Sequence, residues 1–436
     1  MIRTFFRGFF GLVLRIFFRR IELSGLERVP PTGPVIFVLN HPNALIDPAF
    51  MLCLTPRPVS FLAKSTLFTM PVVGAIVRGF DSLPLYRRQD GGGDNLDTFT
   101  QARALLARGG TLAIFPEGTS HSDPRMRPLK TGAARIALGA QLDGLLIHPA
   151  GLYYHAKGTF RSAALLHYGE PFEVARVPMD DDGQPPRDAV NALTDRIEEA
   201  LNQLTLQADH GAALSLIERA ERIFSAADED PDLDALSERF ALKQRFIEGY
   251  QRLQSTHPAL LDALERRIRR YEGDLERLGL DPEHPAPAQF TVGNSLRYAL
   301  KSLLTLGVLL PVAMLGTALH APAWLLTRHL SVRLARGEDD MVGTIKILAA
   351  MLWYLVTWVA AASAAAFFGG PVAFGAAALA GPASAWVALR FHERFDRTWG
   401  AARGLILFLT RRSLFERLHD ERRQIRAEIL ALAEVL

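Results

Sequence analysis

The strongest constraint in this sequence is a pair of long uncharged stretches in its last third. Residues 302–327 are 26 consecutive positions without a formal charge, and residues 347–389 are 43 more. A membrane core is crossed by about 20 apolar helical residues, so the second stretch is long enough to cross twice. The Gly-Gly-Pro sequence at 369–371 predicts a hairpin with a tight turn, made of arms at 347–368 and 372–389. The chain is therefore expected to contain membrane helices.

The first uncharged stretch has basic residues on both sides. Lys301 precedes it and Arg328 follows it, and basic flanks tend to stay on the cytoplasmic face. This pattern favours a segment at 302–327 that enters the membrane and returns, although an ordinary crossing is the alternative. We assign both stretches to a membrane-embedded region at 291–436, which ends in a further helix.

The first 20 residues have an amphipathic pattern, with five arginines and no acidic residue. At 100° per residue, Arg3 and Arg7 fall on one side of a helix, whereas Phe5 and Phe9 fall on the other. Arginines interrupt any apolar core of a signal peptide, so residues 1–20 are expected to form an interfacial helix. The alternative is a helix that packs on the core of its own domain.

Residues 21–206 alternate short apolar runs with amphipathic stretches. The expected strands are at 34–39, 59–63, 111–115 and 145–152, and the expected helices are at 96–107 and 131–141. This alternation indicates an α/β domain with a mainly parallel sheet flanked by helices. Residues 207–290 are strongly charged and show no strand pattern, so a charged helical region is expected there.

Composition excludes several classes of function. A net charge of +3 with 49% hydrophobic residues does not fit a nucleic-acid binder with a broad basic face. Cys53 is the only cysteine, which excludes an intramolecular disulfide and two-cysteine metal or redox motifs. It lies in an apolar context and is expected to fill the core. The sequence contains no HExxH motif, no paired metal spacing and no GxSxG elbow, so neither a metal nor a serine nucleophile is expected.

A histidine follows the first expected strand of the α/β domain. His41 is the first residue of the segment HPNALIDP, and Asp47 is the last but one. A neutral imidazole can take a proton from an alcohol, while a carboxylate fixes its tautomer through the other ring nitrogen. The pair therefore suits general base catalysis, although a His and an Asp at this spacing are more often a surface pair.

A second motif, FPEGTS, lies at the end of the expected strand at 111–115. Gly118 follows Glu117, and a glycine there lets backbone amides approach a bound anion, while Thr119 adds a hydroxyl donor. Lys130 and a helix start near Thr131 follow, and basic residues beside a helix N-terminus are a natural phosphate site. The first motif thus suits deprotonation of an alcohol, and the second suits binding of a phosphate.

These motifs resemble those of the phospholipid and glycerol phosphate acyltransferases. Four blocks match in order: HPNALIDP, then FLAK with LPLYR, then FPEGTS, then IHPAGL. The resemblance implies that His41 is the base, that Asp47 is its partner, and that the acyl group moves directly without a covalent enzyme intermediate. It also implies a set of substrate-binding residues, with the acceptor's phosphate on the arginine: Lys64, Arg87, Glu117, Gly118 and Thr119. The fourth block is often linked to acyl-donor binding.

One departure from the family concerns spacing. The usual block has four residues between histidine and aspartate, whereas this chain has five, residues 42–46. On a continuous helix the extra residue would swing Asp47 by about 100°, so the turn after His41 must absorb it, or Asp47 is not the partner. The longer spacing resembles fungal-type acyltransferases that act on glycerol 3-phosphate, which favours that acceptor.

We therefore expect a membrane-bound O-acyltransferase of phospholipid biosynthesis that transfers a fatty acyl group to glycerol 3-phosphate. The donor is acyl-CoA or an acyl carrier protein, no cofactor is expected, and the partners are membrane lipid and these substrates, not nucleic acid. An acceptor such as 1-acylglycerol 3-phosphate or another lysophospholipid is the alternative, and a noncatalytic membrane scaffold is a more distant one. Arg, Ala and Pro usage, without a recognisable targeting signal, favours a bacterial inner membrane with the catalytic domain cytoplasmic.

Overall fold

The computed structural model describes residues 2–86, 95–225, 235–278 and 292–435. The chain divides into two compact units, each assembled from separate segments. We call the first the sheet unit; it comprises Met1–Gln207, Ala235–Phe240 and Ala335–Ile347. We call the second the helical unit; it comprises Ala208–Asp234, Ala241–Leu334 and Leu348–Leu436. The boundaries of the four regions that we predicted from composition stay predictions.

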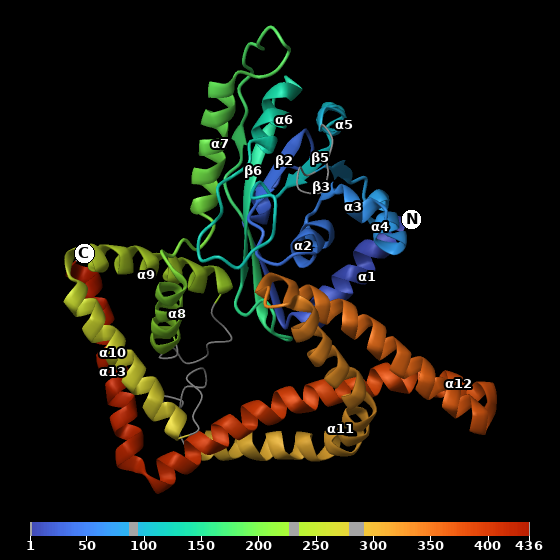
Figure 1. The fold of residues 1–436 in the computed structure, drawn as a ribbon. Helices are drawn as coiled ribbons and strands as arrows, with labels where there is room; N and C mark the ends of the chain where they lie inside the picture. The colour runs from blue at the N-terminus through green and yellow to red at the C-terminus, as the bar shows by residue number, and fades with distance from the viewer. Residues whose placement is uncertain (1, 87–94, 226–234, 279–291, 436) are drawn as a thin grey trace. The chain divides into compact units, whose positions relative to one another are not determined.

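The sheet unit is built on one mainly parallel sheet (Figure 1). Its strands within the described residues are β1 (Arg20–Ser24), β2 (Val35–Leu39), β3 (Ser60–Lys64), β4 (Leu83–Leu85), β5 (Thr111–Ile114), β6 (Leu146–Tyr154), β7 (Ala163–Tyr168) and β8 (Phe172–Glu173). Their order is β1-β7-β6-β2-β5-β3-β4, and β8 also pairs with β6. The pairs β6 with β7 and β6 with β8 are antiparallel, and the other pairs are parallel. The fold class predicted from the sequence is confirmed.

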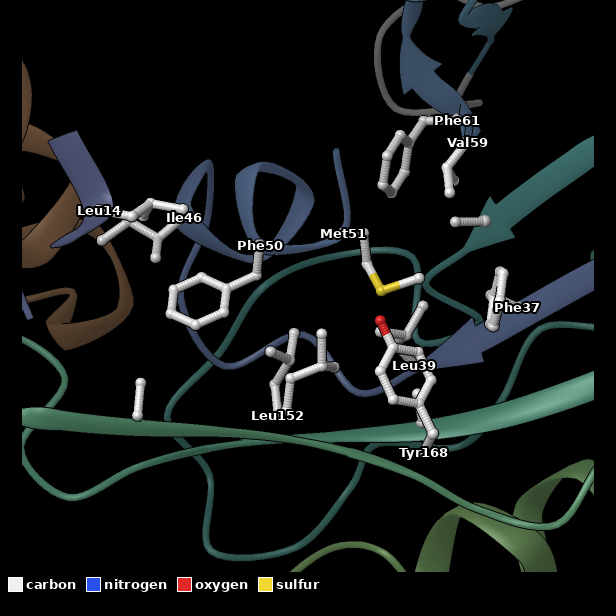
Figure 2. Close-up of a cluster of buried hydrophobic side chains, with 14 of the residues drawn as sticks. Leu14, Phe37, Leu39, Ile46, Phe50, Met51, Val59, Phe61, Leu152 and Tyr168 are labelled. Carbon is white, nitrogen blue, oxygen red and sulfur yellow. The ribbon is translucent and has the colours of Figure 1, made fainter. Parts of the chain in front are cut away.

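Helices cover both faces of this sheet, which explains why the central strands are apolar throughout. Successive side chains of β2 point to opposite faces. Phe37 and Leu39 pack with helices α1 (Ile2–Phe17) and α2 (Ile46–Leu54). Ile36 and Val38 pack with α5 (Leu96–Ala107), α6 (Gly132–Ala140) and α7 (Arg187–Asn202). Figure 2 shows the first cluster, where Phe50 of α2 points toward the strands. The short helices are η1 (Leu26–Arg28), α3 (Ser65–Phe68) and α4 (Pro71–Gly79).

Helix α1 packs on this unit through buried Leu14 and Phe17, and its arginines add polar contacts. Arg7 donates hydrogen bonds to the carbonyls of Cys53 (3.2 Å) and Thr55 (2.7 Å) at the end of α2. The last carbonyls of a helix have no partner within it, so the guanidinium satisfies them. Phe5 and Phe9, in contrast, are 67% and 39% exposed. Phe5 and Phe9 of the predicted aromatic face are therefore turned outward, whereas Phe17 at the end of the helix is buried. The interfacial role of α1 stays a prediction.

The helical unit contains long helices, some of which extend into the segments assigned to the sheet unit. Their bounds are α8 (Gly211–Ser225), α9 (Leu236–Thr256), α10 (Pro258–Arg277), α11 (Val292–Ala335), α12 (Asp339–Thr410) and α13 (Arg412–Val435). Helices α8, α10 and α13 bury one apolar cluster that includes Leu216, Ile268 and Ile425. The charged region at 207–290 is thus helical over most of its described part.

Two helices among the described residues are long and apolar enough to cross a membrane, Lys301–Ala335 and Asp339–Gly400. The second is broken at Gly370, whose φ of 69° and ψ of −165° are not helical. A side chain at Gly381 would touch Trp358 of the preceding arm, so the two arms run back along each other as a hairpin (Figure 1). The path of the first stretch, crossing or re-entrant, stays a prediction.

Candidate active site

Parallel pairing brings the sequence motifs to one edge of the sheet. Strand β2 pairs with β5, and β5 pairs with β3, so their carboxyl ends point the same way. His41 follows β2, Phe115 follows β5, and Lys64 is the last residue of β3. In open α/β sheets, ligands bind beyond the carboxyl ends of the strands. A ligand site is therefore expected at the edge that carries these three residues.

Asp47 is the hydrogen-bond partner of the His41 ring. The imidazole Nδ1 lies 2.8 Å from Asp47 Oδ2. The Asp47 carboxylate is fully buried, and it also accepts the Asn43 backbone N–H (2.7 Å) and the Tyr154 hydroxyl (2.7 Å). Burial, together with the neighbouring Asp47 carboxylate, raises the pKa of Tyr154 well above its usual value, so this hydroxyl stays a donor. Three donors compensate the cost of burying the negative charge.

The turn before α2 absorbs the extra residue between histidine and aspartate. Helix α2 begins only at Ile46, so Asp47 lies in its first turn and the additional position falls in the loop. Ala44 has a φ of 31°, which a residue with a side chain rarely adopts. The Asn43 carbonyl accepts the Ile46 N–H at 2.9 Å and closes the turn. A strained loop thus brings Asp47 to the His41 ring despite the longer spacing.

Aromatic packing sets the orientation of the His41 ring. The ring stacks on Phe115, with centroids 4.1 Å apart and an interplanar angle of 18°. Phe115 in turn stacks on Phe61 at 5.8 Å. Because Nδ1 faces Asp47, Nε2 is the nitrogen that can take a proton from a substrate. The His41 side chain is 15% exposed, which leaves it reachable from solvent.

Glu117 ties the second motif to the first. Its Oε1 accepts the His41 backbone N–H at 2.9 Å, and its Oε2 accepts the Arg127 backbone N–H at 2.9 Å. The same oxygen contacts the ring of His121, whose backbone N–H donates to the His41 carbonyl at 3.1 Å. Glu117 is only 3% exposed, so both of its oxygens are used inside the protein. This geometry makes it a residue that positions His41, whereas its predicted contact with the acceptor stays a prediction.

The other predicted substrate-binding residues are placed less directly. Gly118 has a φ of 76°, and a side chain there would meet that of Lys130. Its N–H donates to the Phe115 carbonyl at 3.0 Å, which closes the turn of the motif. The half-buried Thr119 is next to it. Arg87, the predicted phosphate ligand, lies outside the described residues.

Sequence reasoning missed two residues that hold the site together. Asn40 acts like a further strand residue, because its side chain donates to the Leu152 carbonyl (3.0 Å) and accepts the Leu152 N–H (2.7 Å). Tyr154, at the end of β6, supplies the third bond to Asp47. The polar Asn40 directly before His41 was an available signal, whereas no local pattern marked Tyr154.

His148 is in the core, and the partly buried Cys53 packs against it. His148, in the fourth matched block, is fully buried on β6 between Phe37 and Tyr168, so it cannot contact the acyl donor. Burial lowers its pKa to about 4, which keeps the ring neutral. Burial raises the pKa of the Cys53 thiol to about 11, as suits core filler and not a nucleophile. Within the described part of the chain, no three His, Cys, Asp or Glu side chains are grouped so as to hold a metal ion.

Comparison with known proteins yields two family matches. Residues 20–153 match the family described as Acyltransferase, and residues 216–436 match the Glycerol-3-phosphate acyltransferase 2 C-terminal domain. The chain is 24% identical to an uncharacterized acyltransferase of Schizosaccharomyces pombe over 78% of its length and 65% of that relative. It is 27% identical to glycerol-3-phosphate O-acyltransferase 2 of Saccharomyces cerevisiae over 59% of its length and 36% of that relative.

A shorter match involves a plant protein. The chain is 31% identical to the chloroplastic 1-acyl-sn-glycerol-3-phosphate acyltransferase BAT2 of Brassica napus, over 28% of its length and 34% of that relative. The matches thus span less than two thirds of each of these relatives. The plant match is limited to a part of the chain, whereas the fungal matches extend over more than half of it.

Proposed function

The chain belongs to the glycerol-3-phosphate acyltransferase family, and from this premise we propose that it is a membrane-bound O-acyltransferase of phospholipid biosynthesis. It transfers a fatty acyl group from a thioester to a hydroxyl of glycerol 3-phosphate. The observation that carries the proposal is the His41 ring, bonded to buried Asp47 through one nitrogen and stacked on Phe115 beside the FPEGTS loop.

The reaction follows from this arrangement. As the hydroxyl oxygen of the acceptor attacks the thioester carbonyl, its proton moves to His41 Nε2, and the Asp47 carboxylate stabilises the imidazolium. The tetrahedral intermediate then collapses, the carbon–sulfur bond breaks, and the imidazolium returns the proton to the leaving thiolate. The products are an ester and a free thiol, and His41 ends as it began. General base catalysis of this kind contributes about 10²- to 10⁴-fold.

The identity of the acceptor rests on two observations. The fungal relative named as a glycerol-3-phosphate O-acyltransferase matches 59% of the chain, and this extent favours glycerol 3-phosphate. The plant relative named as a 1-acyl-sn-glycerol-3-phosphate acyltransferase supports a lysophospholipid as the second candidate. We propose Arg87 and Lys64 as ligands of the phosphate group that both acceptors share. A noncatalytic scaffold would not require a buried aspartate held by three donors beside a partly exposed histidine.

The donor and the location complete the proposal. Either acyl-CoA or an acyl carrier protein can present the thioester, and the mechanism requires no cofactor. Two apolar helices, together with the outward Phe5 and Phe9 of α1, support a site held at a membrane surface. We propose that the sheet unit faces the cytoplasm. The fungal relatives lend no support to the bacterial inner membrane that we expected from composition.

The test measures transfer in membranes that contain the full chain. A labelled acyl group, attached to coenzyme A or to an acyl carrier protein, is offered with glycerol 3-phosphate or with lysophosphatidate in parallel. His41→Ala is expected to lower kcat by at least about 100-fold, because it removes the base. The control is His257→Ala, which removes an exposed histidine of the helical unit. Equal activity of His41→Ala and the wild type would refute the mechanism, and turnover with lysophosphatidate alone would refute the choice of acceptor.

A further inference from the structure

The first turns of α12 belong to the sheet unit, although most of this helix belongs to the helical unit. The segment Ala335–Ile347 groups with the sheet unit, and α12 begins within it at Asp339. Lys346 donates to the Gly158 carbonyl at 2.5 Å, and Ile347 packs against the apolar cluster that includes Phe50 of α2. The chain between the two candidate membrane helices is thus anchored on the unit that carries His41.

Thr344 contacts the turn that connects His41 with Asp47. Its hydroxyl oxygen accepts the Leu45 backbone N–H at 3.2 Å, and Thr344 is only 3% exposed. Leu45 is the N-cap of α2, and its own side chain makes no capping hydrogen bond. Backbone donors at a helix start have no partner within the helix, so an acceptor must come from elsewhere. Thr344 supplies it next to the strained Ala44.

Gly343 allows this close approach. A Cβ atom at Gly343 would lie 2.9 Å from Ile46 Cδ1, 2.9 Å from the Lys157 carbonyl oxygen and 3.0 Å from Asn43 Oδ1. Separations this short between heavy atoms force the neighbours to move. A glycine therefore lets the α12 backbone reach the turn, and a side chain would push it away.

Electrostatics add a third link between α12 and the turn. The Lys157 ammonium donates to Ser122 Oγ at 2.7 Å and to the Pro42 carbonyl at 3.4 Å. Burial lowers the pKa of Lys157, while the carboxylates of Asp340, Asp47, Asp339 and Asp123 raise it. Asp340 is 7% exposed and comes from the first turn of α12. The acidic start of α12 thus attracts a lysine that also holds the turn.

We propose that the first turns of α12 hold the His41–Asp47 turn in its catalytic shape, with Thr344 as a positioning residue that acts through Leu45 and Gly343 as the residue that permits the contact. This inference rests on the proposed acyl transfer. It makes the activity depend on a segment that lies far from the matched motifs in the sequence and continues directly into the apolar hairpin.

The test compares Thr344→Val, which removes the hydroxyl at nearly constant volume, with Thr344→Ser, which keeps it. Loss of an acceptor for a partly buried N–H is expected to lower kcat about 5- to 10-fold in Thr344→Val. The KM values should stay unchanged, because substrate contacts are not altered. Thr344→Ser is expected to recover most of kcat. The matched control is Thr357→Val in the same helix, whose hydroxyl donates to the Trp353 carbonyl of its own turn.

Hydrogen exchange of the full chain gives a readout that is independent of turnover. The Leu45 amide is expected to exchange about 5- to 10-fold faster in Thr344→Val than in the wild type, and at the wild-type rate in Thr344→Ser and Thr357→Val. Gly343→Ala is a second variant that removes no hydroxyl and should lower kcat as well. If the wild type transfers no acyl group, the proposed function fails, while the exchange rates still decide whether Thr344 holds the turn.

Three results would overturn the inference. The first is wild-type kcat and wild-type Leu45 exchange in Thr344→Val. The second is equal impairment of Thr344→Ser and Thr344→Val, which would assign the effect to packing and not to the hydroxyl. The third is full activity of Gly343→Ala, which would show that close approach of α12 is not needed.

Discussion

The hydroxyl of Tyr154 offers the sharpest test of how the site is built. Tyr154→Phe removes one of the three donors to the buried Asp47 carboxylate and changes little else in the side chain. A hydrogen bond to a charged group contributes about 1.5–3 kcal/mol, so the variant should lose about this free energy of unfolding. Asp47 would also be held less firmly against His41, and we expect kcat to fall about tenfold with little change in KM.

A matched control lies nearby in the same sheet. Tyr168 is fully buried and belongs to the apolar cluster drawn in Figure 2. Its hydroxyl is 2.9 Å from Thr55 Oγ1, a neutral partner. Tyr168→Phe should therefore cost only about 0.5–1.5 kcal/mol of stability and leave kcat intact. Initial rates of acyl transfer and thermal unfolding of both variants, in the same membranes or detergent, separate the two effects.

The pH dependence of this comparison follows from the raised pKa of Tyr154. Its hydroxyl stays protonated in the folded chain beyond its usual value of about 10, so it donates to Asp47 throughout a neutral assay range. The ratio of wild-type to Tyr154→Phe kcat should therefore be constant from about pH 6 to about pH 9. The reasoning is refuted if Tyr154→Phe and Tyr168→Phe lose kcat equally, or if Tyr154→Phe keeps the wild-type kcat.

Three further predictions concern the core and the first helix. His148→Phe should abolish a loss of stability in acid. The pKa of His148 is about 4 in the folded chain, against about 6.5 when unfolded. The neutral ring therefore contributes up to about 3 kcal/mol to the free energy of unfolding above pH 6.5, and this contribution disappears as the pH falls to about 4. Thermal unfolding at several pH values checks this, and an unchanged acid slope would contradict it. Cys53→Ala should keep the wild-type kcat, because a thiol of pKa about 11 is protonated at neutral pH; a folded but inactive variant would contradict that reading. In a Cys53→Ala background, a spin label at Phe9→Cys should collide more with oxygen dissolved in lipid than with a water-soluble relaxant, and a label at the exposed Arg108→Cys should do the reverse. Equal accessibility of both labels to water would argue against membrane contact of α1.

Local patterns in the sequence determined much of this protein. The apolar runs predicted β2, β3, β5 and β6 to within a few residues, because strands buried on both faces need continuous hydrophobic sequence. Charge-free stretches marked the two helices that are long and apolar enough to cross a membrane. The motifs at the ends of β2 and β5 indicated His41 and Glu117, since parallel strands bring their carboxyl ends together.

Only the tertiary structure decided which groups meet. The spacing of His41 and Asp47 left their pairing open. In the structure a strained turn brings the two side chains together, and Thr344, a residue about 300 positions away, accepts a hydrogen bond from that turn. Tyr154 completes the bonds of Asp47, and Glu117 accepts the His41 backbone N–H. Hydrophobic periodicity is a local property that a sequence displays, whereas hydrogen-bond partners depend on how distant segments pack.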